Sequence, residues 1–343
     1  MTEKTISEKA EAIYRSAIVC DLTLPWSSGP PDGRAKALND VAEAGINFIS
    51  LTMGTDFSTT HDTLRLIAAE RARTAASGNL VFVETVEDIA DARRSGRLAV
   101  GFHFQGAGPL ANDVELIPVF YALGVRHMIL AYNQRNRFCD GCFEVNDGGL
   151  SRLGMRAVDE LNRVGMILDC SHLSYHSSMQ IIDRSSAPVM FSHSNADAVL
   201  PSFRNIKDDQ IVACAEKGGL IGVCGAGKFL TASQESTVEG LADHIDHIAG
   251  LVGDSNVALG LDAVYYPEVF YRLYAERRDA YPADVPPPPW NYFDQGELRH
   301  LPDVLLARGY SDESIVGILG GNFLRLASRV WKPVDDAWPT GKY

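Results

Sequence analysis

Residues 165–172 read GMILDCSH and residues 187–193 read APVMFSH, and these two stretches decide the fold. Each is a nearly continuous apolar run of strand length that ends in a serine and a histidine. Apolar runs of this kind are typical of parallel strands that helices cover on both faces. Residues 174–185 and 207–217, which follow them, have helical periodicity. The two stretches therefore predict two neighbouring units, each a β-strand followed by an α-helix.

The same pattern recurs along the chain. Further strand-like runs lie at residues 17–22, 46–52, 98–104, 126–132, 219–225 and 256–262. Helices are expected at residues 36–45, 61–76, 86–95, 113–123, 150–164, 236–252 and 297–308. Alternation of strands and helices favours a parallel sheet, and eight units in about 250 residues predict a (β/α)8 TIM barrel. An open nucleotide-binding sheet is not favoured, because the turn DLTLPWSSGP after the first run lacks a glycine-rich phosphate motif.

Length and composition indicate one globular domain. The chain has 343 residues, of which 46% are hydrophobic and 22% are charged. We expect a single barrel over residues 1–343, with a helical extension over residues 1–16 and a lid-like aromatic insertion over residues 263–296, after the eighth strand. The net charge is −13 and no basic stripe occurs, which argues against binding to nucleic acid or to an anionic membrane.

The N-terminus and the cysteines indicate a compartment. The first residues, MTEKTISEKAEAIYRSA, lack the apolar core of a signal peptide, and no run of about 18 apolar residues occurs. The six cysteines do not have the dense spacing of a disulfide scaffold. We therefore expect a cytoplasmic protein.

Polar side chains end most of the predicted strands. In a barrel these side chains point into the mouth, where active sites of this fold lie. The set comprises Asp21, Thr23, His103, Gln105, Tyr132, Asn133, Asp169, Ser171, His172, Ser192, His193 and Asp262. Arg204 follows the sixth strand, and Tyr265 begins the insertion. Among them, Arg204, Asn133 and Tyr265 are expected to contact the substrate.

His172 and His193 are the strongest candidates for a metal site. Two imidazoles at the mouths of adjacent strands can reach one zinc ion at about 2.0–2.1 Å. The alternative is that each histidine is a hydrogen-bonded core residue. We favour the shared site, because both histidines end a buried strand in the same local sequence.

Asp262 and Arg204 could each take part in the reaction or serve only a structural role. Asp262 ends the last strand in LGLD and is a candidate general base or metal ligand. It is alternatively a helix cap or a salt-bridge partner of Arg204. Arg204 can bind a substrate carboxylate through two N–H groups. It can instead form a surface salt bridge with Asp208 or Asp209.

Five segments together resemble the membrane (renal) dipeptidase family of the amidohydrolase superfamily. They are ILDCSHLS, VMFSHSNADAV, PSFRN, ALGLD and GILGGNFLRLASRVW, and the resemblance covers about residues 15–332. It implies a (β/α)8 barrel that hydrolyses an amide bond next to a free carboxylate, with two zinc ions bridged by a glutamate. It also implies a homodimer and a small-molecule substrate with a carboxylate.

The resemblance assigns roles to four residues of this chain. His172 and His193 match the two histidines of one metal site. Arg204 matches the arginine that binds the substrate carboxylate. Asp262 matches the catalytic aspartate after the last strand.

Other positions depart from the family pattern. The family's His-x-Asp pair falls on Asp21 and Thr23, or on Thr23 and Pro25 if the strands are aligned on their aspartates. The bridging glutamate falls on Gln105, and a substrate-contacting histidine falls on Tyr132. Several ligands of a two-metal centre are therefore missing.

The missing carboxylate ligands matter because two metal ions held close together repel each other. Two divalent ions about 3.5 Å apart repel each other by on the order of 19 kcal/mol at an effective dielectric constant of about 20. A neutral amide at Gln105 does not compensate that repulsion, so we expect the second metal site to be absent. We expect one zinc ion on His172 and His193, with Gln105 or Asp262 as a further ligand. His103 could add an imidazole below Gln105 on the same strand.

Three functions follow in order of preference. The first is a dipeptidase-like hydrolase with at most one metal ion, in which Asp262 accepts a proton from the attacking water and Tyr132 polarises the scissile carbonyl. The second is a lyase or isomerase that acts on a small carboxylate with little or no need for metal. The third is a non-catalytic binder that retains the pocket.

Overall fold

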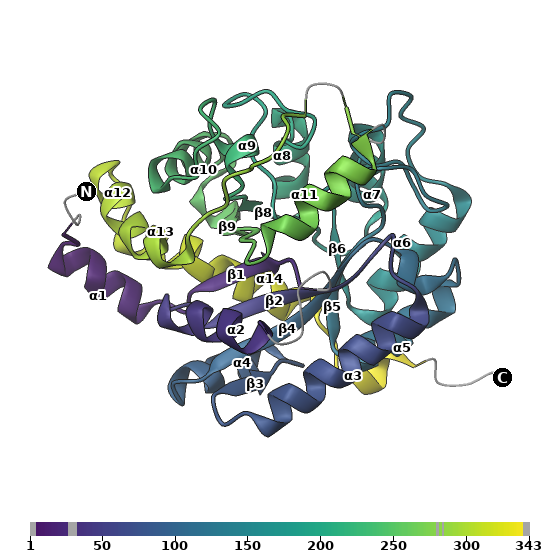
Figure 1. Ribbon diagram of the computed structural model, residues 1–343, viewed down its shortest axis with the longest axis horizontal. Coiled ribbons are helices and arrows are strands. Elements are labelled where there is room, and N and C mark those ends of the chain that lie inside the picture. The colour runs from purple at the N-terminus through teal and green to yellow at the C-terminus, as the bar shows by residue number, and fades with distance from the viewer. Residues whose placement is uncertain (1–4, 27–32, 279–280, 283–284, 339–343) are drawn as a thin grey trace.

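Eight parallel strands form the barrel of the computed structural model, which describes residues 5–26, 33–278, 281–282 and 285–338 (Figure 1). The barrel strands are β1 (Cys20–Leu24), β2 (Phe48–Thr55), β4 (Leu98–Gln105), β5 (Val125–Ile129), β6 (Ile167–Asp169), β7 (Met190–Phe191), β8 (Leu220–Val223) and β9 (Val257–Leu259). Each strand is hydrogen-bonded to the next in this order. All eight fall within or overlap the predicted runs, and the (β/α)8 class is confirmed.

One strand was not predicted. β3 (Leu80–Phe82) pairs with β4 outside the barrel, and its three residues are only partly buried. The run is too short and too exposed to stand out from the neighbouring loop by its apolar pattern.

The seam of the barrel lies between β9 and β1, the two ends of the strand order. Asp21 in β1 bridges this seam: its Oδ1 accepts the backbone N–H of Leu261 at 2.8 Å, just beyond β9. Its Oδ2 accepts the side-chain amide of Gln295 at 2.7 Å. A buried carboxylate thus joins the first strand, the last strand and the end of the insertion.

Helices surround the strands. They are α1 (Glu8–Ser16), α2 (Arg34–Glu43), α3 (Thr60–Ala76), α4 (Val86–Arg94), α5 (Ile117–Ala122), α6 (Arg152–Val164), α7 (Tyr175–Arg184), α8 (Asp208–Glu216), α9 (Gly227–Leu230), α10 (Val238–Val252), α11 (Pro267–Glu276), α12 (Leu301–Ala307), α13 (Asp312–Val316) and α14 (Asn322–Val330). Serine or threonine hydroxyls cap the N-termini of α1, α3, α4, α6, α7, α10 and α13. These caps satisfy N–H groups that have no partner inside the helix.

The C-terminal segment packs on the barrel. Phe323 of α14 stacks on Phe48 of β2 with ring centroids 5.3 Å apart. The Asn322 side chain donates to the backbone oxygens of Asp254 and Val257 at 2.9 Å each. The segment GGNFLR therefore joins the last helix to the start of β9 and helps to fix the frame of the site.

The segment after β9 contains more regular structure than the sequence indicated. Residues 263–296 were expected to be an irregular insertion, yet α11 forms within them. Tyr274 of α11 packs edge-on against Trp290, with ring centroids 5.3 Å apart. These aromatic side chains form their own small core, which accounts for the helix.

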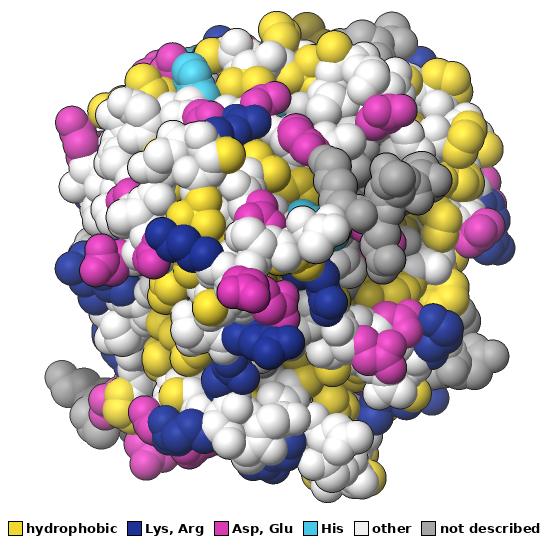
Figure 2. All heavy atoms as spheres, turned by 90° about the vertical axis from the view of Figure 1, so that its left-hand side faces the viewer, with side chains coloured by type: hydrophobic (Ala, Val, Ile, Leu, Met, Phe, Trp, Pro, Cys, Tyr) yellow, Lys and Arg dark blue, Asp and Glu magenta, His cyan; other side chains and the backbone are white. Residues whose placement is uncertain are grey.

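Charges of both signs are interspersed on the face of the molecule that Figure 2 shows, where apolar side chains are scattered between them. Within the described part of the chain, no helix combines the length and the apolar character that a membrane-spanning segment requires.

Candidate active site

Most of the predicted site residues surround one narrow cavity of about 60 Å³ at the carboxyl ends of the strands. Of the residues that line it, those predicted from the sequence are Gln105, Tyr132, Asn133, His172, Arg204 and Asp262. Phe270, Tyr281, Trp290 and Tyr292 of the segment after β9 complete the wall. Strands that end at one rim thus bring together side chains that lie far apart in the sequence.

His172 and His193 face each other directly. Their Nε2 atoms are 2.8 Å apart, and the exposed fractions of the two residues are 6% and 0%. Burial, followed by the positive charge of Arg204, lowers the pKa of His193 to about 3 and the pKa of His172 well below its usual range. Both imidazoles are therefore neutral at pH 7, which is the form that binds a metal ion.

The partners of the other ring nitrogens decide what this pair can do. His172 Nδ1 lies 2.6 Å from Asn133 Oδ1, an acceptor, so Nδ1 donates and Nε2 carries a lone pair. His193 Nδ1 lies 2.6 Å from the Ser192 hydroxyl and 3.2 Å from the Thr23 hydroxyl. A hydroxyl can donate or accept. The pair therefore suits either an N–H···N hydrogen bond or two lone pairs directed at one ion.

The backbone at the rim is held in unusual conformations. Asn133, His172 and Asp262 have φ values of 63°, 66° and 52°. These values lie in the left-handed region, which residues other than glycine rarely adopt. Such residues cost about 1–3 kcal/mol each and persist where the surrounding structure fixes them. Three of them around one cavity indicate a site that is built in advance of substrate binding.

Asp262 is the acidic side chain of the cavity. Partial burial raises the pKa of its carboxyl to about 6, and the positive charges of Arg204 and Lys228 oppose that rise. A carboxylate whose pKa lies near neutrality is suited to accept a proton in a reaction. The general-base interpretation of Asp262 is thus favoured over a helix cap.

Arg204 is a buried cation, 5% exposed. One guanidinium N–H donates to the backbone oxygen of His193 at 3.2 Å, and the group lies 5.5 Å from the centre of the Phe229 ring. The alternative salt bridge is wrong, because Asp208 pairs with His247 at 2.8 Å and Asp209 accepts the Tyr175 hydroxyl at 2.6 Å. A buried guanidinium in this position is ready to bind an anion.

Sequence reasoning missed Lys228, which also lines the cavity. It lies in α9, and its Nζ is 3.4 Å from the centre of the Trp290 ring. Partial burial lowers the pKa of the Lys228 ammonium to about 8, and the carboxylate of Asp262 opposes that shift. The available signal was that Lys228 is the first polar side chain after the seventh predicted strand, whose end otherwise carries only apolar residues and glycine.

Tyr265 and Asp21 lie away from the cavity. The Tyr265 hydroxyl donates to Gln295 Oε1 at 2.8 Å, and Gln295 in turn donates to Asp21. Asp21 also accepts the backbone N–H groups of Leu261 and Thr23. Burial raises the pKa of Asp21 to about 7 despite these three donors. The two carboxylate oxygens are thus used inside the fold.

We expect Asp21→Ala to lower the free energy of unfolding by about 3 kcal/mol, because it leaves buried donors of Leu261 and Gln295 without an acceptor. Urea denaturation measures the change. Asp40→Ala, which removes only an exposed helical ion pair with Lys36, is the control and should cost less than about 0.5 kcal/mol. Equal effects of the two substitutions would contradict a bridging role for Asp21.

The expectation that His103 adds an imidazole to a metal site is wrong. Its Nδ1 and Nε2 are each 2.9 Å from a hydroxyl, of Ser50 and Thr52 respectively. Ser50 also contacts His127, whose Nδ1 lies 3.2 Å from Asp169. These side chains form a closed hydrogen-bonded layer below the rim and leave no ring nitrogen for an ion.

The other candidate ligand positions are neutral or already hydrogen-bonded. Asp21 is bonded inside the fold, the Thr23 hydroxyl lies against His193, and Gln105 is neutral. Across the described residues, no group of three His, Cys, Asp or Glu side chains is placed to hold an ion. Gln105 lines the same cavity as His172, and its Nε2 is buried without a hydrogen-bond partner in the described structure.

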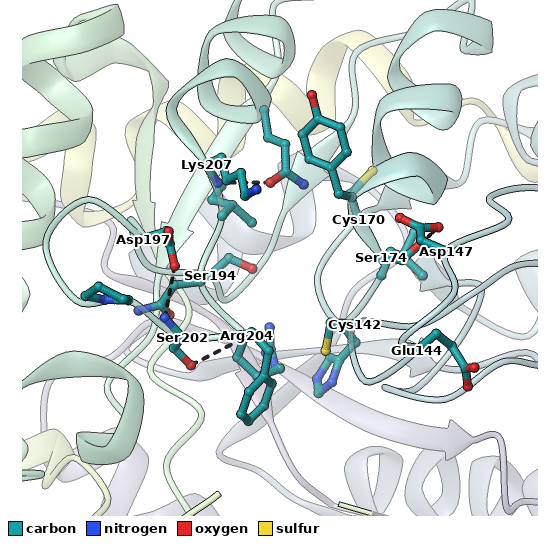
Figure 3. Close-up of a pocket in the computed structure, with 18 residues that line it drawn as sticks. Cys142, Glu144, Asp147, Cys170, Ser174, Ser194, Asp197, Ser202, Arg204 and Lys207 are labelled. Atoms are coloured by element: carbon teal, nitrogen blue, oxygen red, sulfur yellow. Dashed lines mark hydrogen bonds between the residues drawn. The ribbon is translucent and has the colours of Figure 1, made fainter. Parts of the chain in front are cut away.

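A wider pocket of about 460 Å³ adjoins the cavity at His172, Phe203 and Arg204. Figure 3 shows Arg204 between Ser202 on one wall and Cys142 on the other. The outer wall carries the acidic side chains of Glu144, Asp147 and Asp197, together with Lys207. The cavity thus continues into a space that can hold the rest of a small substrate.

The barrel and the chemistry at its rim define a class: a (β/α)8-barrel enzyme with its site at the carboxyl ends of the strands. The sequence profile described as "Membrane dipeptidase (Peptidase family M19)" matches residues 35–267, so the chain belongs to the membrane dipeptidase family. This confirms the resemblance seen in the sequence. The protein is therefore a dipeptidase-like hydrolase by family, and the family is one of metallopeptidases.

Individual relatives agree with this assignment. The chain is similar to the uncharacterized dipeptidase C965.12 of Schizosaccharomyces pombe, with 28% identity over 87% of this chain and 71% of the relative. It is 32% identical to Dipeptidase verJ of Clonostachys rogersoniana over 74% of this chain, but the match spans only 61% of that relative. A crystal structure of an amidohydrolase from Pseudomonas aeruginosa superposes with a TM-score of 0.84 and 25% identity, over 94% of this chain and 99% of the other.

Proposed function

We propose that this protein hydrolyses an amide bond in a small substrate that carries a free carboxylate, and that it uses at most one zinc ion. The observation that carries the proposal is that Arg204 and Asp262 line the same cavity. Arg204 is a buried cation that forms no ion pair with a carboxylate of the described residues. Asp262 is a carboxylate whose pKa is raised. Binding of an anion and acceptance of a proton are the two tasks that such a hydrolysis requires.

The residues divide these tasks. Arg204 binds the carboxylate of the substrate and fixes the position of the neighbouring amide bond. Asp262 accepts a proton from the attacking water and returns it to the departing amine. Burial raises the pKa of Tyr132, so its hydroxyl stays protonated and donates to the scissile carbonyl. The aromatic residues after β9 exclude water from the reacting groups.

His172 and His193 are the residues that would hold the ion, with Gln105 as a third ligand. A zinc ion supplies a Lewis acid and lowers the pKa of bound water towards neutrality. The proposal is limited to one ion because the neutral Gln105 stands where the resemblance places a bridging carboxylate.

A panel of dipeptides, combined with metal analysis, tests the proposal. We expect wild-type protein to hydrolyse some members of the panel and to bind no more than one zinc ion per chain. His193→Ala should remove that zinc and abolish most of the activity, because a single imidazole holds zinc weakly. Ser233→Ala, a substitution on the exposed turn after α9, is the control. Full activity after exhaustive chelation would contradict a role for the ion.

A second candidate is a lyase or isomerase that acts on a small carboxylate without metal. The direct contact between the Nε2 atoms of His172 and His193 favours it, since the two neutral rings can pass a proton between them. Conversion of a carboxylate without uptake of water, unaffected by chelation, would establish this function instead.

A further inference from the structure

Lys228 has no place in the assignments made so far, yet its surroundings are those of a functional residue. Its side chain is partly buried in the cavity wall, 3.4 Å from the centre of the Trp290 ring and 4.9 Å from that of Phe229. No carboxylate of the described residues forms an ion pair with it. Aromatic rings offset only part of the hydration that an ammonium group loses on burial.

The cavity therefore contains two cations and one anion. Arg204 and Lys228 carry positive charge, and Asp262 is the acidic residue in its lining. A substrate carboxylate bound at Arg204 leaves Lys228 and Asp262 as the other charged side chains of the lining, and neither forms an ion pair among the described residues.

Hydrolysis of an amide supplies the missing negative charge. Water forms a C–O bond to the carbonyl carbon, Asp262 takes the water proton, and the π electrons of the carbonyl move to its oxygen. Asp262 becomes neutral as the oxyanion appears, so one negative charge moves from Asp262 to the substrate oxygen. The oxyanion then returns its electrons, the C–N bond breaks, and the nitrogen takes the proton from Asp262.

We infer that Lys228 is a further catalytic residue, whose ammonium group stabilises the oxyanion that hydrolysis forms. The inference rests on the proposed hydrolysis. It accounts for a lysine in the cavity lining that has no ion-pair partner among the described residues. Preorganised positive charge directed at a developing oxyanion is among the largest contributions to catalysis.

The structural alternative is that Lys228 only holds Trp290 in place. Lys228→Met tests the two explanations, because methionine keeps the apolar contact with Trp290 and removes the charge. We expect kcat to fall about 100-fold with little change in KM, which is the usual cost of losing one oxyanion partner. Lys228→Arg should restore most of the activity. Lys36→Met, which removes an exposed lysine of α2 that pairs only with Asp40, is the matched control.

Binding measurements separate this inference from the proposed function. The probes are the phosphinate analogue of Ala-Ala, which carries a negative charge in place of the oxyanion, and the neutral ketomethylene analogue. By calorimetry, Lys228→Met should weaken phosphinate binding about 100-fold and ketomethylene binding less than about 3-fold. Equal weakening of both ligands, or of neither, would overturn the role of Lys228 alone. If wild-type protein fails to bind the phosphinate, amide hydrolysis is wrong as well.

Discussion

Asp262→Asn should reduce kcat/KM for the preferred dipeptide by about 10³- to 10⁴-fold, the largest effect that we expect from one substitution. Asparagine cannot accept the proton of the attacking water. It is also the best choice for a clean test, because asparagine tolerates the left-handed backbone that Asp262 adopts at φ 52°. Unchanged thermal unfolding would show that the loss is chemical.

The pH profile gives an independent measurement of the same role. The pKa of Asp262 is raised to about 6, and only the ionised carboxylate can act as a base. As the pH falls below about 6, kcat/KM should therefore drop about tenfold per pH unit, and Asp262→Asn should lack this acid limb. A variant that keeps a tenth of the wild-type activity, with the limb intact, would place the base elsewhere.

Arg204→Met should lower kcat/KM about 10³-fold, mainly through KM, because a desolvated charge pair is worth several kcal/mol when one partner is removed. A second buried arginine provides the comparison. Arg126, 2% exposed, donates through Nε and Nη1 to the backbone oxygens of Glu84, Tyr121 and Val125, so two of its three guanidinium nitrogens are used within the fold. Arg204 has one such bond, to His193, and thus has donors available for a ligand.

A substrate without the carboxylate tests the partner of Arg204 directly. A dipeptide amide should be a poor substrate of the wild-type protein, and Arg204→Met should reduce its turnover much less than that of the free acid. This double-mutant comparison isolates the pairwise interaction. Equal losses for acid and amide would show that Arg204 stabilises the rim and does not bind the carboxylate.

The sequence was sufficient for the barrel because its strands are buried on both faces. Runs such as residues 98–104 are apolar except for His103, and the corresponding strand β4 is buried along its whole length. β3 was missed because it packs outside the barrel and stays partly exposed. α11 was missed because it is stabilised by contacts such as that of Tyr274 with Trp290, which only the folded chain brings together.

The site was predicted where strand order alone determines position. His172 and His193 end neighbouring strands, so their meeting followed from the topology. Strand position does not determine what a side chain contacts below the rim of the barrel. His103 hydrogen-bonds to Ser50 and Thr52 instead of reaching the site. Lys228 was missed because its significance depends on Trp290, 62 residues further along the chain.

The cavity has two kinds of wall, and they differ in how freely they can change. The reacting groups Asp262 and Tyr132 follow strand ends, whereas Phe270, Tyr281 and Trp290 come from the segment between Asp262 and Gln295. Replacement of the part from Phe270 to Trp290 as a cassette would leave Asp262, Tyr132, Arg204 and Gln295 in place. Selectivity for a new side chain can therefore be engineered, or acquired in evolution, without rebuilding the catalytic groups.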